Sequence, residues 1–124
     1  MAFTTTIIEE GHRNYVIQVV GTGADAAALL VDVSALNPPC QKLRLQRVSY
    51  DIAPAGTASL TWQGDAQPFL TMSEGPGQTM CYKKVGGIPN RNPASNGDVL
   101  LDTPANAKYS FTLHFIKSNA IIPL

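Results

Sequence analysis

The feature of this sequence that most constrains its fold is a strict two-residue alternation near the C-terminus. Four large apolar side chains take every second position there, with polar residues between them: Tyr109, Phe111, Leu113 and Phe115. Successive side chains of a β-strand point to opposite faces, so this pattern predicts a strand with one packed face. The other face meets solvent or a partner. His114 falls on that polar face, where we expect a surface or interface group and not a base.

Similar short runs fill the chain, separated about every eight to twelve residues by Gly, Pro, Asn and Asp. No helical stripe of useful length interrupts them. This spacing indicates an all-β fold, namely a single antiparallel β-sandwich or jelly roll of about eight strands. We expect one domain over residues 1–124, with an N-terminal arm (1–10) and a short C-terminal tail (118–124). The predicted strands cover residues 4–9, 13–20, 27–33, 42–53, 57–63, 68–72, 78–85 and 98–117, the last split by a turn at 103–106.

Two of these strands carry further information. In the strand over 42–53, apolar residues occupy odd positions up to Leu45 and even positions from Val48 onward. One extra residue near Gln46 and Arg47 would cause this change, which predicts a β-bulge or a bend from one sheet to the other. In the strand over 13–20, only Gln18 is polar among residues 15–20, so we expect both of its faces to be covered.

The charge balance excludes one large class of partner. The chain has 124 residues, with nine basic and nine acidic side chains, and charged residues make up 15% of it. Nucleic-acid binding needs a cluster of Lys and Arg, whereas Lys42, Arg44 and Arg47 are spread along one predicted strand. A weakly charged surface repels its neighbours little, which suits a subunit that other subunits cover. We therefore expect protein partners and no nucleic acid.

The start of the chain predicts its place of synthesis. It has no basic region followed by an apolar one, and no apolar run of membrane-spanning length occurs in the sequence. We expect synthesis in the cytoplasm and no membrane partner.

No catalytic or metal-binding motif emerges from the sequence. It contains no GxSxG elbow, P-loop, HExxH or dinucleotide fingerprint. The two carboxylates Glu9 and Glu10 are adjacent, so on a strand they point to opposite faces and cannot form a glycosidase pair. We expect no enzyme activity, no cofactor, no metal and no small-molecule substrate. Trp62 alternates with Leu60 and is expected in the core.

The two cysteines, Cys40 and Cys81, have no CxxC partner. A zinc site is not expected, because four ligands are needed and only His12 and His114 could join them. Two reduced, buried thiols are the default expectation for a protein made in the cytoplasm, with a disulfide as the alternative.

Three segments look suited to protein contacts. These are the N-terminal residues 2–8, the long loop over 86–97 and the apolar end over 120–124. The loop is long for a hairpin and has few apolar residues that could pack against one another, so we expect a partner to hold it. The C-terminal segment is apolar, and exposing it to water is unfavourable. The candidate interface residues are Phe3, Ile7, Ile8, Ile88, Asn90, Arg91, Asn92, Ile121, Ile122 and Leu124.

The order of several short pieces resembles a known group of proteins. These pieces lie at residues 31–36, 42–48, 58–62, 86–88, 97–101 and 109–113. Together they resemble small virion structural proteins of tailed bacteriophages, over roughly positions 11 to 117. The sequence departs from that pattern at Ser49-Tyr50, where an aromatic pair is usual, and at residues 104–108, where the loop is shorter.

The resemblance implies a β-sandwich or jelly-roll module of the capsid cement or decoration type. Such a subunit would bind the major capsid protein from the outer capsid surface, with copies of itself arranged as a homotrimer. No catalytic residue is carried over. Two alternatives remain open, a phage tail or neck adaptor and a carbohydrate-binding β-sandwich, the latter requiring an exposed aromatic platform.

Overall fold

The computed structural model describes residues 3–36, 40–91, 94–103 and 108–120, and it confirms an all-β fold. Within these ranges there is no α-helix, only the short 3₁₀ turns η1 (Val33–Ala35) and η2 (Lys83–Val85). The strands are β1 (Phe3–Glu10), β2 (Asn14–Thr22), β3 (Asp25–Val31), β4 (Cys40–Trp62), β5 (Leu70–Cys81), β6 (Ile88–Pro89), β7 (Val99–Thr103) and β8 (Lys108–Ala120).

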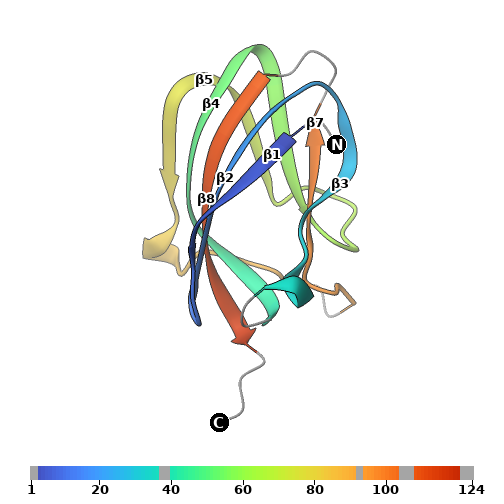
Figure 1. The fold of residues 1–124 in the computed structure, drawn as a ribbon, viewed down its shortest axis with the longest axis vertical. Coiled ribbons are helices and arrows are strands. Elements are labelled where there is room, and N and C mark those ends of the chain that lie inside the picture. The colour runs from blue at the N-terminus through green and yellow to red at the C-terminus, as the bar shows by residue number, and fades with distance from the viewer. Residues whose placement is uncertain (1–2, 37–39, 92–93, 104–107, 121–124) are drawn as a thin grey trace.

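The strands form an antiparallel β-sandwich whose two layers are joined by β4 and β5. The main strand order is β1-β2-β8-β4-β7-β3, with β5 and β6 also paired to β4. In the first layer, β1, β2, β8 and the first part of β4 lie side by side. In the second layer, Ser59–Trp62 of β4 pairs with β7, and β7 pairs with β3. β5 follows β4 through both layers, and Figure 1 shows the two strands bending together over the upper end of the molecule.

This bend corrects two predicted boundaries. The segments predicted as separate strands at 42–53 and 57–63 are one strand, β4, with register shifts against β5 between Tyr50 and Thr57. The predicted loop over 73–77 likewise lies inside β5, where Ile52 pairs with Gly75 and Gly77 takes a φ of +60°. The strand predicted over 78–85 ends at Cys81. A sheet corner keeps its ladder while changing layer, so turn-forming residues there do not end the strand.

The predicted phase change in β4 is confirmed as a β-bulge. Leu45 pairs with Phe115, and Arg47 pairs with His114, so Gln46 is the extra residue. Gln46 is buried, and its carbonyl oxygen accepts a hydrogen bond of 2.8 Å from the backbone N–H of Tyr82.

The core lies between the two layers. The apolar side chains of β8 from Tyr109 to Phe115 are all at most 3% exposed, as their alternation predicts. Trp62 is also buried, and its ring stacks on Phe69 with centroids 3.9 Å apart. Trp62 is therefore a core residue.

Two expectations about single elements are wrong. Both faces of β2 were expected to be covered, but Gln18 is exposed and Val20 keeps 50% of its surface. Both cysteines were expected to be buried, but only Cys40 is, while Cys81 is exposed at the end of the edge strand β5. Both thiols are free.

Candidate interaction surface

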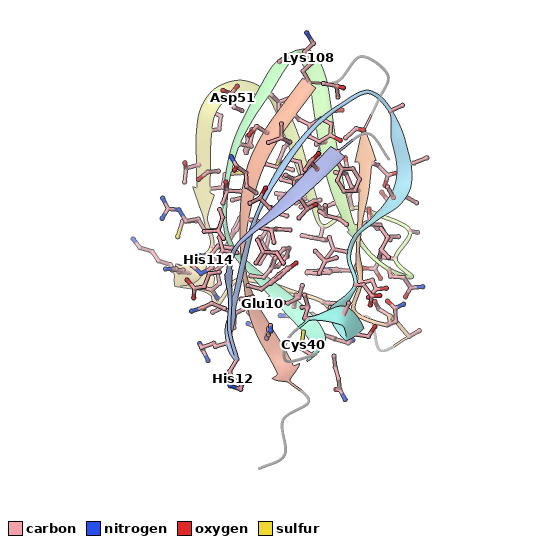
Figure 2. All side chains as sticks on the ribbon, viewed as in Figure 1. Glu10, His12, Cys40, Asp51, Lys108 and His114 are labelled. Atoms are coloured by element: carbon pink, nitrogen blue, oxygen red, sulfur yellow. The ribbon has the colours of Figure 1, made fainter. Side chains whose placement is uncertain are left out.

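Ionisable groups are dispersed over this molecule. Over the described ranges, no three His, Cys, Asp or Glu side chains come together in a way that could hold a metal ion. Figure 2 shows Asp51 near the upper end of the molecule, His114 on its left side and His12 at the lower end. General acid–base chemistry needs groups within hydrogen-bond reach of one substrate, and these residues are far from that arrangement.

The outer face of the first layer carries a row of short polar side chains, one from each of five neighbouring strands. The pairings are consecutive across the sheet, so all five side chains share this face. We call them the hydroxyl row: four members carry a hydroxyl, Thr6, Thr112, Ser49 and Thr79, and the fifth, Gln18, carries an amide. The hydroxyls of Ser49 and Thr79 share a hydrogen bond of 3.2 Å. The row contains no charged side chain.

A shallow depression of about 220 Å³ lies over one end of the hydroxyl row. Its lining includes Ser49, Thr79, Thr112 and the carboxylate of Asp51. The small residues Ser110 and Gly77 also line it, together with Tyr50, Gln78 and Phe111. One carboxylate without an imidazole beside it supplies neither an acid–base pair nor a nucleophile with its base.

A second row, two residues further along the strands, carries charge. Val16, His114, Arg47 and Cys81 lie side by side on β2, β8, β4 and β5. Burial lowers the pKa of His114, and the positive charges of Lys83 and Arg47 lower it further, whereas Glu9 opposes them. His114 is accordingly neutral near pH 7 and leaves Arg47 as the charge at the centre of this row.

The N-terminal candidates lie on β1, which is the outermost strand of the first layer. Phe3 is half-buried and packs against the core. Ile7 and Ile8 are 54% and 57% exposed, although both are large apolar residues. Exposed apolar groups of this size on an edge strand are typical of protein contacts.

The described residues of the loop over 86–97, namely 86–91 and 94–97, are held to their own domain. Ile88 and Pro89 form β6 against β4, and the Arg44 guanidinium donates a 2.7 Å hydrogen bond to the carbonyl oxygen of Gly86. Asn90 is only 7% exposed, and its amide donates a 3.0 Å hydrogen bond to the Ser95 hydroxyl.

The remaining loop and tail candidates offer less to a contact surface, or cannot be placed on one. Ile88 is half-buried and Arg91 is exposed. Asn90, Ile88 and Arg91 thus offer a partner very different amounts of surface. Four other predicted contacts lie outside the described residues, and these are Asn92, Ile121, Ile122 and Leu124.

No protein family, curated protein or solved structure matches this sequence. Among the residues that the structure describes, no helix is long and apolar enough to cross a membrane. The case for function therefore depends on the surfaces described above and on the resemblance of the sequence pieces.

The sequence reasoning missed the hydroxyl row and Val20. The sequence shows each member of the row only as a polar position within its own strand. It does not show which strands are neighbours, so it cannot show that these positions form a row. A weak signal existed, since the polar positions hold Thr, Ser and Gln more often than Lys or Glu. Short polar side chains at outward positions indicate a face that meets another surface.

Proposed function

We propose that the protein is a bacteriophage virion structural protein, a capsid cement or decoration subunit that binds the major capsid protein from the outside. The observation that carries the proposal is the hydroxyl row itself, a line of uncharged polar side chains across five neighbouring strands of one sheet face. The phage setting comes from the resemblance of the sequence pieces. The homotrimeric arrangement of copies is part of the same proposal.

The chemistry of this face suits a contact that buries it. Thr and Ser have few rotamers, so fixing them at an interface costs less conformational entropy than fixing Lys, Glu or Arg. A standard interface buries roughly 1,600 Å² in total. Several copies, each bridging neighbouring coat subunits, would add such contacts over a shell that is under internal pressure.

The proposal is tested by mixing the purified protein with capsids that lack it and measuring co-sedimentation. The matched variants are Thr112→Arg, which raises a long charged side chain in the hydroxyl row, and Thr57→Arg on the opposite layer. Thr57 is exposed and pairs with Ser73. We expect the wild type and Thr57→Arg to co-sediment, and Thr112→Arg to lose most of its binding.

Absence of wild-type binding at every concentration would refute the cement function. Loss of binding with Thr57→Arg alone would place the contact on the other layer. The copy number per particle distinguishes a cement subunit from a phage tail or neck adaptor. A cement subunit is present in hundreds of copies, whereas an adaptor is present in tens at most.

A further inference from the structure

Four described strands lie at the edges of this sandwich, namely β1, β3, β5 and the two-residue β6, and they differ in how well another strand could add to them. β3 has two register shifts against β7, and β5 is broken by the irregular stretch around Gly75 and Gly77. Such irregularities protect a sheet edge from pairing with another chain. β1 stays in unbroken register with β2 from Phe3 to Ile7 and shifts only after Ile7. Among the described residues, β1 pairs with β2 alone.

Up to Ile8, this edge is uncharged and exposes large apolar side chains beside its threonines. Four large apolar residues of the described chain are exposed, and two of them are Ile7 and Ile8 on β1. A third, Val20, is paired directly with Thr4. Residues 3–8 contain no ionisable side chain. A long, regular and uncharged edge is the kind that recruits a further strand.

We propose that the segment Phe3–Ile7, here called the β1 edge, pairs antiparallel with the β1 edge of a second copy, centred on Thr5. The sequence of this segment is Phe-Thr-Thr-Thr-Ile, with an apolar residue at each end and threonines between. In the centred register, Phe3 lies opposite Ile7 of the second copy, and Thr4 lies opposite its Thr6. Aromatic–β-branched and Thr–Thr pairs are both favourable across antiparallel strands.

The faces of the strand agree with this register. Residues opposite each other in an antiparallel pair must point to the same face of the sheet. Phe3, Thr5 and Ile7 share one face of β1, because Thr5 and Ile7 pair with the buried residues Val19 and Ile17. A register centred on Thr5 pairs only residues of like parity, so both faces of the sheet continue across the junction.

The negative charges that follow the β1 edge favour an antiparallel over a parallel pairing of two copies. Glu9 and Glu10 follow the β1 edge, so the centred antiparallel register keeps the acidic ends of the two copies apart. A parallel pairing would bring them side by side. This pairing has two-fold symmetry and occupies the β1 edge of both copies, so it joins only two copies. It is therefore a different contact from the one that would form the proposed trimer. Five residues per copy make a small interface, and the dimer is weak in solution and favoured where copies are crowded on a particle.

The first test uses cysteine cross-linking of the purified protein in a Cys81→Ser background, which removes the exposed thiol and leaves the buried Cys40. Thr5→Cys places two thiols opposite each other at the centre of the pair. The control Thr4→Cys, one residue away on the other face, places its thiol opposite Thr6 of the second copy. We expect mild oxidation to give a covalent dimer at least about tenfold faster with Thr5→Cys. Equal rates would overturn the proposed register.

The second test uses charge. We expect Thr5→Lys and Thr5→Glu each to weaken the dimer at least about tenfold, because like charges then meet at its centre, and an equimolar mixture of the two to restore it. Thr57→Lys makes the same change on an interior strand of the other layer and should dimerise like the wild type. Sedimentation equilibrium up to about 1 mM measures the wild type, the three variants and the mixture. A wild type that stays monomeric, or a mixture without rescue, would refute the pairing.

The inference deepens the proposed function by naming how neighbouring copies touch, and it rests on that function for its setting on a particle. Dimerisation is measured without capsids, so the two proposals fail separately. A dimer that does not bind capsids would refute the cement role alone, and a capsid-binding monomer would refute the β1 pairing alone.

Discussion

At the residue scale, Gly97 lies just before β7 in a backbone conformation and a space that suit only glycine. Its φ is +96°, and a Cβ there would collide with the carbonyl oxygen of Gln41 and lie 3.0 Å from a Val33 methyl group. We expect Gly97→Ala to lower the free energy of unfolding by more than about 2 kcal/mol, through strain and overlap together. Gly11→Ala is the control, because a Cβ at Gly11 meets nothing within 4 Å. Urea denaturation should show a change within about 0.5 kcal/mol for Gly11→Ala. Similar losses for both variants would contradict the argument.

A second single residue, His114, makes the free energy of unfolding depend on pH. Burial, Lys83 and Arg47 lower its pKa below the ordinary 6.5, with Glu9 opposing them. Below pH 6.5 the unfolded chain therefore takes up a proton at this position more readily than the folded one. Stability attributable to His114 is present above 6.5 and is lost as the pH falls through the gap between the two values.

We expect His114→Gln to flatten the decline in urea-measured stability between about pH 7 and pH 5. The wild type and the variant should converge as the pH falls through this window. Equal slopes for the two proteins would show that the proton uptake lies elsewhere.

At the scale of single elements, the bulge in β4 is an insertion that the ladder with β8 does not need. Without Gln46, Leu45 and Arg47 would become neighbours, and each would keep its present partner on β8. We expect the protein lacking Gln46 to fold, losing about 1–3 kcal/mol with the Tyr82 hydrogen bond and the local twist. Deleting Ser49 in place of Gln46 should cost more stability, because the ladder can then be restored only by straightening the bulge, which turns Arg47 toward the core and Val48 toward solvent. Circular dichroism and urea denaturation compare the two deletions, and a Ser49 deletion as stable as the Gln46 deletion would contradict this account.

The same element shows what the sequence could predict about the fold. The change of phase located the irregularity near Gln46 and Arg47, because alternation is a local property of one strand, and the structure shows that it is a bulge at Gln46. The sequence predicts a turn near Gly56, where the structure has a sheet corner. The same residue types bend a strand between two layers and end a strand at a turn, so the sequence does not distinguish the two. Whether β4 continues through the corner depends on β5, which is paired with it on both sides.

At the scale of the whole molecule, the candidate surface was only partly visible in the sequence. Ile7 and Ile8 could be chosen because they are apolar residues near the chain end, and the structure leaves both exposed. Asn90 looked like a free loop residue, but the loop folds back on β4 and buries it. The hydroxyl row joins residues as far apart as Thr6 and Thr112, and only the strand order brings them together.

The even charge balance of the molecule also has a consequence for binding. Nine basic and nine acidic side chains cancel, and the hydroxyl row holds none of them. Long-range attraction between opposite charges weakens steeply as salt shortens the Debye length, whereas buried apolar and hydrogen-bonded contacts are screened much less. We expect the dissociation constant for capsids to change by less than roughly threefold between about 0.05 M and 0.5 M salt, as measured by co-sedimentation. Thr57→Arg, whose added charge is on the opposite layer, should show the same flat dependence. Release of the wild type from capsids at the higher salt concentration would instead assign the contact to charged groups such as Arg47 and Asp51.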